Sequence, residues 1–433
     1  MSGSLRRAFL LASVAALAAG TSASSSAKDI TRRMSVGPFG VEADAASLGC
    51  CNGISGDGRY LAFTSTATNL VPNGATGVFV RDRMSGMTKN VSLGIDGKSP
   101  DGPTQGASIS VDGRFVLFSS AADNLARGDT NKTWDVFITD RKTGLLRRVS
   151  VGNRGAQAKG SSIGFALTAD GGMAAFWSDA PNLVPGDTNG ENDVFLRDLK
   201  NVTTERISVS TSGEQGNGLS YWPAISHGGD VVAYASSATN LVANDTNRAA
   251  DIFVRDRKAG TTERVSLGPN GIQGNGDSLD PQISADGRFV AFRSIASNLV
   301  PGDTNGTWDV FVRDRKAGTT VRVSVGSKGE QGNGFSAMAA ITPDGRFVAF
   351  GSEASNLVPN DRNRWADTFL HDMKTGATIR TSISASGEEG DNDSVLASLS
   401  ADGRLVMFTS LADNMVPGDR NGEADVFLRI LRP

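Results

Sequence analysis

The sequence predicts an all-β fold, a seven-bladed β-propeller with four antiparallel strands per blade, and three observations lead to it. A unit of about 58 residues occurs seven times in tandem. Each unit carries four short strand signals separated by turn residues. The last unit lacks its final strand, and the beginning of the chain supplies one. We therefore expect a single domain over residues 28–433, although 433 residues would otherwise suggest two or three.

The repeat is marked by the string Ser-x-Asp-Gly-Arg, and Asp-Gly is a strong hairpin signal because its residues tolerate positive φ. The clearest copy begins at Ile283 and reads ISADGRFVAF. The fourth copy is degenerate, with Gly228 in place of the aspartate. The marker aspartates of the other units are Asp57, Asp112, Asp170, Asp286, Asp344 and Asp402.

The clearest unit also defines the four strands expected in each blade. The first strand ends at Ile283, and the second covers Arg288–Ser294. The third covers Asp309–Arg315 and the fourth Thr320–Gly326, with a Lys-x-Gly turn between them. In the second strand, both alternating faces are apolar. A sheet covered on both sides by neighbouring blades requires that pattern.

The chain ends predict that the ring is closed. The last unit stops after its third strand, at Pro433. The segment Thr31–Gly37, TRRMSVG, matches the missing fourth strand. An N-terminal strand that completes the last blade would remove the exposed sheet edges that promote aggregation.

The N-terminus has the features of an export signal over residues 1–27. Arg6 and Arg7 precede a short apolar stretch, Ala8–Gly20, and small residues allow cleavage after Ala23 or Ala27. We expect a periplasmic or extracellular protein with no stable membrane span after cleavage. An uncleaved anchor is the alternative, and the arginine pair leaves Sec and twin-arginine export both open.

The unit SADGRFVAF…DVFVRDRKAGTT resembles the PD40, or TolB-like, class of WD40-like β-propeller repeats over about residues 30–433. The resemblance implies an exported bacterial propeller. Such propellers serve as binding platforms, scaffolds and enzyme domains, so the resemblance implies the fold more strongly than an activity.

Loop lengths predict which face carries function. The connections between strands two and three, and between blades, are long, and alternate connections of an antiparallel sheet lie on one side. The first of these loops carries a motif Asp-x-Asn-x-x-x-Asp in six units, which either forms Asx turns or binds Ca²⁺ through its oxygens. The motif residues, unit by unit, are Asp129, Asn131 and Asp135; Asp187, Asn189 and Asp193; Asp245, Asn247 and Asp251; Asp303, Asn305 and Asp309; Asp361, Asn363 and Asp367; and Asp419, Asn421 and Asp425.

Because repeated residues are expected to be architectural, functional residues should be exceptions to the repeat. The approach to strand one varies most, and aromatic residues and arginines on a rim are typical of ligand or partner recognition. The candidate binding residues are Tyr221, Trp222, Trp134, Trp308, Trp365 and Arg364. Other exceptions near strand one are Cys50, Cys51, Phe165, Asp280, Phe335 and Met338.

The sequence gives little basis for catalysis or for a cofactor other than possible calcium. The two histidines, His227 and His371, both stand at repeat positions, and no zinc-like spacing or nucleophile motif occurs. A net charge of −3 gives no support for nucleic-acid binding. We expect a monomeric, non-enzymatic propeller that binds a protein or glycan. The alternative is a polysaccharide lyase that uses Tyr221 and nearby arginines.

Overall fold

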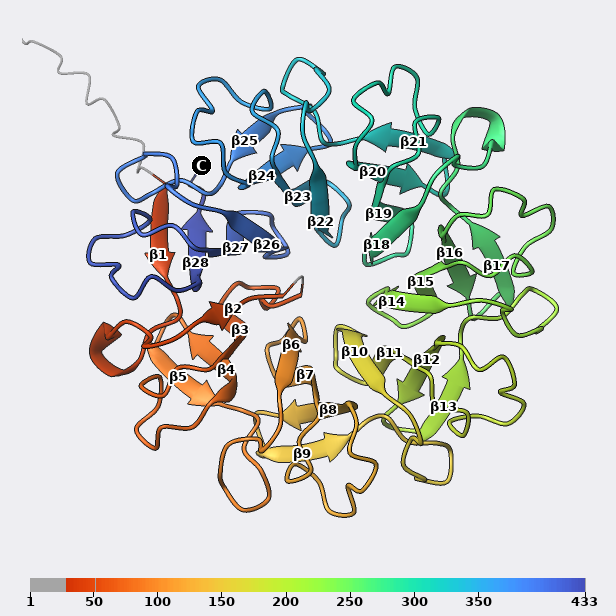
Figure 1. Cartoon of the computed structure of the whole chain (residues 1–433), viewed down its shortest axis with the longest axis horizontal. Helices are drawn as coiled ribbons and strands as arrows, with labels where there is room; N and C mark the ends of the chain where they lie inside the picture. The colour runs from red at the N-terminus through yellow and green to blue at the C-terminus, as the bar shows by residue number, and fades with distance from the viewer. Residues whose placement is uncertain (1–28, 51, 433) are drawn as a thin grey trace, which may run out of the picture.

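The computed structural model describes residues 29–50 and 52–432, and this part of the chain forms seven four-stranded antiparallel sheets arranged in a ring (Figure 1). The predicted signal segment, residues 1–27, lies outside the described residues. Two 3₁₀ turns, η1 (Pro38–Gly40) and η2 (Pro269–Gly271), are the helical segments of the described chain. The predicted seven-bladed propeller is confirmed.

Blades 1 to 4 each contain four consecutive strands, ordered from the channel outwards. These are β2 (Ser47–Leu48), β3 (Tyr60–Ser65), β4 (Gly77–Asp82) and β5 (Met87–Asn90); β6 (Thr104–Ile109), β7 (Phe115–Ser120), β8 (Asp135–Asp140) and β9 (Leu145–Arg148); β10 (Ser162–Leu167), β11 (Met173–Ser178), β12 (Asp193–Asp198) and β13 (Thr203–Arg206); and β14 (Ser220–Ile225), β15 (Val231–Ser236), β16 (Asp251–Asp256) and β17 (Thr261–Arg264).

Blades 5 and 6 follow the same order, and blade 7 takes its outermost strand from the beginning of the chain. These strands are β18 (Ser278–Ile283), β19 (Phe289–Ser294), β20 (Asp309–Asp314) and β21 (Thr319–Arg322); β22 (Ser336–Ile341), β23 (Phe347–Ser352), β24 (Asp367–Asp372) and β25 (Thr378–Arg380); and β26 (Ser394–Leu399), β27 (Leu405–Ser410), β28 (Asp425–Ile430) and β1 (Ile30–Arg33).

In blade 5 the first three strands agree with the sequence prediction, but the fourth is shorter. It ends at Arg322 and not at Gly326. The chain leaves the sheet here because the Ser324 hydroxyl donates a hydrogen bond to the buried Asp309 carboxylate, at 2.5 Å. Val325 then pairs only through a single bridge with Gln331, inside the loop to the next blade.

The ring closes as the chain ends predicted. β1 pairs antiparallel with β28, from Ile30 opposite Ile430 to Arg33 opposite Phe427. The Met34 N–H continues the pairing by donating to the Val426 carbonyl at 2.7 Å. The N-terminal strand therefore supplies the outer edge of blade 7.

The core lies between adjacent blades, where the middle strands carry apolar side chains on both faces. On β19, Val290, Ala291 and Phe292 are fully buried. In every blade an aromatic ring of strand two stacks on a Phe of strand three; in blade 5, Phe292 and Phe311 have centroids 6.0 Å apart. This stacking holds each blade as a rigid sheet, so the loops at its two ends are positioned precisely.

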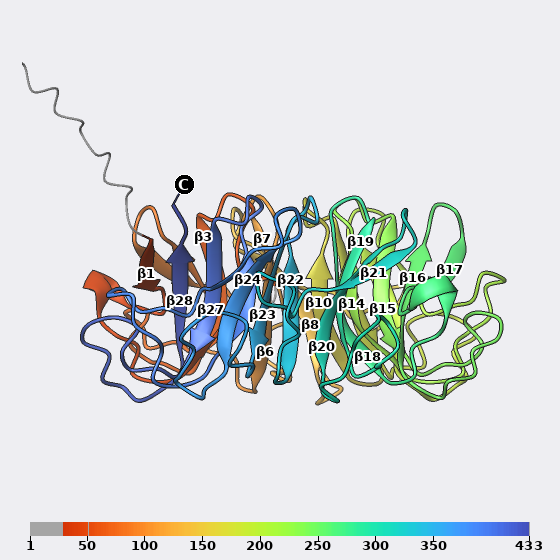
Figure 2. The same ribbon diagram turned by 90° about the horizontal axis from the view of Figure 1, so that it is seen from above.

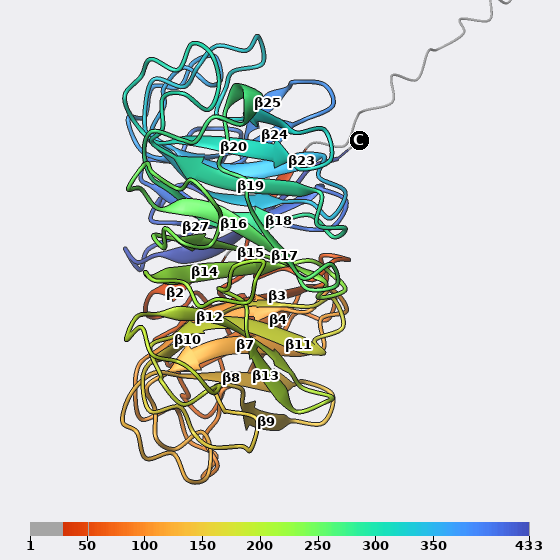
Figure 3. The same cartoon turned by 90° about the vertical axis from the view of Figure 1, so that its right-hand side faces the viewer.

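The two faces of the disc differ as the loop lengths predicted (Figures 2 and 3). We call the side with the long loops the long-loop face, and the side with the tight turns, where β28 ends, the short-turn face. The first strand of each blade lies innermost and lines the central channel (Figure 1). Within the described chain, none of the helical segments has the length and apolar character that a bilayer span needs.

Candidate functional site

The repeated Asp-x-Asn-x-x-x-Asp motif forms a compact polar junction between strands three and four and the following loop. In blade 5, Arg322 Nη1 lies 3.3 Å from carboxylate oxygens of both Asp303 and Asp309. Gln331 Nε2 donates to the same two carboxylates at 2.9 and 3.1 Å. Asn305 Nδ2 donates to Asp309 at 3.0 Å and to the Gly332 carbonyl at 3.0 Å. The motif thus ties the long loop to the chain that leads to the next blade.

Blade 2 shows what the predicted metal-ligand asparagine does. Asn131 Nδ2 donates to Asp135 and to the Ala158 carbonyl, both at 3.1 Å. Asn131 Oδ1, the oxygen that a cation would need, instead accepts the Thr133 N–H at 3.3 Å. That contact between a side chain and the N–H two residues on is an Asx turn. For Asn131 the structure therefore shows the structural alternative, in which both ends of the amide hold the loop.

The carboxylates of blade 2 are neutralised in the same way as those of blade 5. Arg148 Nη1 lies 3.1 Å from Asp129 and 3.2 Å from Asp135, and Gln157 donates to Asp129 at 2.7 Å. Burial, together with the charge of Asp135, raises the pKa of Asp129 to about 6, while Arg148 opposes the shift. An arginine thus supplies positive charge between two carboxylates.

Blade 3 repeats these contacts with its own residues. Arg206 pairs with Asp187 and Asp193, and Asn189 Nδ2 donates to Asp193. Asn189 Oδ1 accepts the Glu191 N–H at 3.0 Å, which is again an Asx turn. The motif therefore has a structural role in each of these junctions, and calcium binding by the loops stays a prediction.

Blades 6 and 7 depart from this pattern, because Glu389 and Glu42 stand where blades 2 to 5 have glutamine. Carboxylate oxygens of Glu42, Asp419 and Asp425 come within 4.8 Å of one another, and Arg33 pairs with all three. Asp419 is only 3% exposed, and its Oδ1 atom has no hydrogen-bond partner among the described residues. Burial raises the pKa of Asp419 to about 7, Arg33 opposes this, and Glu42 and Asp425 add to it.

Exceptions to the repeat gather at the junction of blades 4 and 5, beside the channel mouth on the long-loop face. We call Tyr221, Trp222, Asp280, Arg293 and Trp308 the aromatic–arginine cluster. The Arg293 guanidinium lies 4.7 Å from the Trp308 ring centroid and 5.9 Å from that of Trp222. Arg293 Nε lies 2.6 Å from Asp280 Oδ2. Tyr221 and Trp222 meet edge to face, with centroids 4.8 Å apart.

Bulges in the backbone of the innermost strands determine where side chains of this cluster point. The pairing of β14 with β15 shifts between Tyr221 and Ala224, and that of β18 with β19 shifts between Leu279 and Gln282. At these bulges Trp222 has φ of 51° and Asp280 has φ of 55°. A β-bulge changes the direction of the side chains it carries. The bulges therefore determine how Trp222 and Asp280 are presented at the channel.

The cluster is partly desolvated, which affects its titratable groups. Burial raises the pKa of Asp280, while the Arg293 charge acts against the shift. Burial also raises the pKa of Tyr221, and the carboxylates of Asp277 and Asp280 add to the effect. At neutral pH the cluster therefore presents a neutral phenol beside the Asp280–Arg293 contact.

The structure brings together only part of the predicted binding set. Tyr221, Trp222 and Trp308 meet, whereas Trp134 lies in the equivalent loop of blade 2. Trp365, 45% exposed, and the exposed Arg364 lie in the loop of blade 6. Sequence reasoning missed Arg293, which links the two tryptophans. The available signal was its register on strand two, where the other blades have Thr64, Ser119, Trp177, Ala235, Gly351 and Thr409.

The two histidines lie outside the aromatic–arginine cluster. His371 on β24 is buried, and its Nδ1 atom lies 2.9 Å from the Thr378 hydroxyl. His227 lies in the turn between β14 and β15, at the short-turn end of the channel. Burial lowers the pKa of both imidazoles, so both are neutral at pH 7.

No protein-family model and no curated protein matches this sequence. Solved structures match its fold at low identity. An oligogalacturonate lyase in complex with manganese is 14% identical, with a TM-score of 0.56 over 93% of this chain and 96% of that chain. The propeller domain of the Trilobed protease from Pyrococcus furiosus is 12% identical, with a TM-score of 0.52 over 89% and 94% of the two chains.

TolB from Acinetobacter baumannii is 17% identical, with a TM-score of 0.39, and the match covers 69% of this chain and 60% of TolB. At these identities the likenesses show the β-propeller fold alone. Membership of the PD40 class stays a prediction.

Proposed function

We propose that this protein is an exported, non-enzymatic binding propeller that recognises a glycan through the aromatic–arginine cluster on its long-loop face. The observation that carries the proposal is the convergence of Trp222, Arg293 and Trp308, which lie on separate segments. Half-buried indole rings can cover the C–H face of a sugar, and an Asp–Arg pair can exchange hydrogen bonds with its hydroxyl groups. The export part of the proposal rests on the signal-like sequence of residues 1–27.

Two features of the cluster favour binding over a lyase reaction. A tyrosine base needs its phenolate form, and burial raises the pKa of Tyr221. The positive charge of Arg293 is already paired with Asp280, which leaves less of it to neutralise a substrate carboxylate.

The test titrates the mature chain, residues 28–433, with a panel of neutral and uronate polysaccharides by calorimetry. We expect at least one glycan to bind, and Trp308→Ala to weaken that binding by about tenfold or more. Trp134→Ala is the matched control, because Trp134 directly precedes Asp135 as Trp308 precedes Asp309. Equal loss in both variants, or none in either, would remove the cluster as the site.

The same incubations separate the lyase alternative. A rise in the absorbance of unsaturated uronate products that Tyr221→Phe abolishes would replace the binding proposal with the enzymatic one. Capture of a protein ligand with no glycan binding would contradict the proposed ligand class. Cell fractionation with sequencing of the mature N-terminus tests export.

A further inference from the structure

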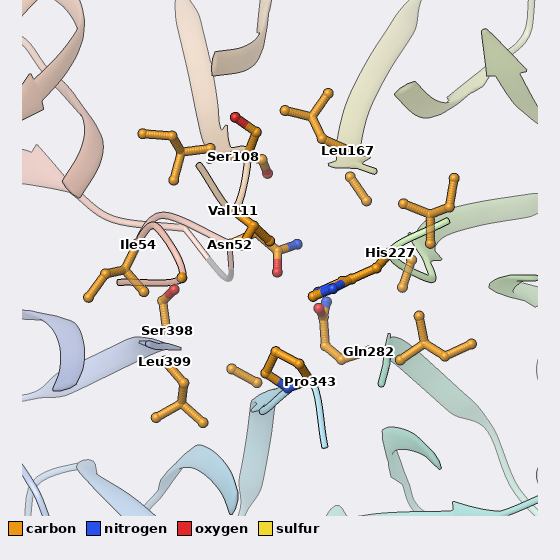
Figure 4. A pocket seen from close by; sticks show the side chains of 18 of the residues that line it. Asn52, Ile54, Ser108, Val111, Leu167, His227, Gln282, Pro343, Ser398 and Leu399 are labelled. Atoms are coloured by element: carbon orange, nitrogen blue, oxygen red, sulfur yellow. The ribbon is translucent and has the colours of Figure 1, made fainter. Parts of the chain in front are cut away.

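A second site lies at the opposite end of the channel, on the short-turn face. There, strand one and the following turn of all seven blades surround a cavity of about 110 Å³ (Figure 4). This volume exceeds several-fold the roughly 10–15 Å³ that a single water requires. It is therefore large enough for a small organic molecule.

An apolar ring forms part of the wall of this cavity, because each blade contributes one branched aliphatic side chain at the same register. These side chains are Ile54, Ile109, Leu167, Ile225, Ile283, Ile341 and Leu399. The apolar ring belongs to the repeat and gives the cavity an apolar wall.

A ring of backbone hydrogen bonds holds the rim of the cavity. In each unit the residue before the marker position faces its equivalent in the next blade, and six N–H groups donate to the next carbonyl at 2.9–3.1 Å. Pro343 interrupts the ring, since proline has no N–H, and the Ala401 carbonyl accepts no backbone N–H among the described residues. The donor–acceptor pairs are Gly56–Val111, Val111–Ala169, Ala169–His227, His227–Ala285, Ala285–Pro343 and Ala401–Gly56.

Besides the apolar ring, the wall of this cavity has a polar part, to which side chains and the backbone ring both contribute. Asn52, His227 and Gln282 point towards its centre, and Ser398 also lines it (Figure 4). Gln282 is 7% exposed and Ser398 is 1% exposed. At the register of Gln282, blades 3, 4 and 6 have alanine. Asn52, His227 and Gln282 are therefore exceptions to the repeat, as functional residues are expected to be, whereas Ser398 has a counterpart in Ser108 of blade 2.

Four polar side chains of the cavity are not used by the fold itself. Across residues 29–50 and 52–432, the side chains of Asn52, His227, Gln282 and Ser398 have no hydrogen-bond partner. Their polar atoms are open to the cavity, because none of them belongs to the fully buried side-chain atoms of the described residues that lack a partner. Their convergence on one cavity therefore leaves these donors and acceptors available to a bound molecule.

The charge of the lining limits the chemical class of that molecule. Among the described residues that line the cavity there is no Asp, Glu, Lys or Arg. Because burial lowers the pKa of His227, its imidazole adds no positive charge at pH 7. A charged ligand would lose its hydration without gaining a counter-ion, which is costly. Two amides, an imidazole and a hydroxyl instead offer both donors and acceptors.

We propose that the channel cavity on the short-turn face binds a small neutral molecule that carries several hydroxyl or amide groups. The aliphatic ring contacts the carbon skeleton of this molecule, while Asn52, His227, Gln282 and Ser398 hydrogen-bond to its polar groups. The site lies on the face opposite the aromatic–arginine cluster and is independent of the glycan proposal.

The experiment uses the mature chain and a panel of neutral probes: glycerol, myo-inositol, glucose and acetamide. Gluconate and acetate serve as charged counterparts. Saturation-transfer NMR measures binding, and the His227 imidazole resonances report its location. We expect at least one neutral probe to bind and shift the His227 signals, while the charged counterparts bind at least about tenfold more weakly.

Variants locate the site without disturbing the fold. Gln282→Ala installs the residue that three other blades carry at this register, so a native melting temperature is expected, together with an at least about tenfold loss of probe affinity. His227→Ala should cause a similar loss. Trp308→Ala, on the other face, should leave probe binding unchanged. Absence of binding by every neutral probe, equal binding of gluconate and glucose, or full binding by the Gln282→Ala/His227→Ala variant would each overturn the proposal.

Discussion

At the scale of single residues, Glu42 stands where blades 2 to 5 have glutamine and changes the chemistry of the blade 7 junction; blade 6 has a glutamate, Glu389, at the same position. In blades 2, 3 and 5 a glutamine amide donates to the first aspartate of the motif. A hydrogen bond between Glu42 and Asp419 can form only when one of these two carboxyl groups holds a proton. The buried Asp419 oxygen without a partner is the consequence. Arg33 pairs with both of these carboxyl groups, the Arg420 N–H donates to Glu42, and an Asp425 oxygen lies within 4.8 Å of both.

The raised pKa of Asp419 makes blade 7 sensitive to pH. The native state retains a proton on Asp419 up to about pH 7, whereas the unfolded chain loses it near pH 4, so its contribution to stability is complete below pH 4 and falls as pH rises to 7. In Glu42→Gln the amide can donate to Asp419 without this proton. We expect the melting temperature of this variant, relative to the wild type, to rise by about 1–3 °C from pH 5 to pH 8.

Glu423→Gln is the control for this measurement, because Glu423 is exposed in the same loop. Its melting temperature should keep a constant difference from the wild type. The melting temperatures are followed by calorimetry. If those of Glu42→Gln and the wild type changed with pH in parallel, the idea that a proton held between Glu42 and Asp419 stabilises the native state would be contradicted.

At the scale of strands, the bulges on the channel-lining strands place residues at positive φ in five blades. Gly106 occupies this register in blade 2, and Trp222, Asp280, Met338 and Leu396 occupy it in blades 4 to 7. Positive φ costs a non-glycine residue about 1–2 kcal/mol. The side chains at this register are therefore retained against a local backbone cost.

Met338 allows that cost to be measured, because it is 38% exposed and has φ of 56°. We expect Met338→Gly to be more stable than Met338→Ala by about 1 kcal/mol in urea unfolding, since only glycine adopts this conformation freely. At Val348, on a regular strand, the order should reverse, with Val348→Gly less stable than Val348→Ala. An alanine variant at 338 as stable as the glycine variant would rule out strain at the bulge.

Closure of the ring also depends on a single strand, because β1 pairs with β28. Removing residues 29–37 exposes the edge of β28 and takes Met34 out of the core that it covers. We therefore expect the melting temperature to fall by about 5–10 °C. Reattaching the same residues after Arg432 through a flexible linker should restore most of the loss. An unchanged melting temperature after the deletion would contradict closure.

At the scale of the whole molecule, the same polar junction recurs in blades 2 to 7, whereas blade 1 lacks the motif. Each of these junctions joins two aspartates to an arginine of strand four and to the loop that enters the next blade, as Arg322 and Gln331 do in blade 5. A second asparagine lies earlier in the loop between strands two and three and recurs in all seven units, from Asn69 to Asn414. In every blade it donates to a backbone carbonyl of the loop that enters that blade; Asn298, for example, donates to the Gln273 carbonyl at 2.9 Å. These contacts hold the long loops to the disc in all seven blades.

The arginines and the Asx turns determine our expectation for calcium. In blade 2 a guanidinium already lies between the two carboxylates, and the Asn131 oxygen is held by a backbone N–H, so a cation would have to displace both before these oxygens could act as ligands. We expect the melting temperature of EDTA-treated protein to be unchanged by millimolar Ca²⁺, and titration calorimetry to give no binding heat. Stabilisation by Ca²⁺ that Asp129→Asn reduces would show instead that the loops bind the metal.

The sequence alone determined the seven blades, the four strands in each, the closure by β1 and the separation of long loops from tight turns. These features follow from local patterns that recur at a fixed period, and a period of about 58 residues needs no knowledge of distant contacts. It also predicted Tyr221, Trp222 and Trp308 as candidates.

Only the tertiary structure decided which exceptions meet. Arg293 joins Trp222 to Trp308, and Asn52, His227, Gln282 and Ser398 converge on one cavity from four blades. The physical reason is that a closed ring places equivalent registers of all blades around a common axis. Residues far apart in the chain thereby become neighbours, and their proximity depends on ring closure, strand bulges and side-chain direction, which the repeat pattern does not encode.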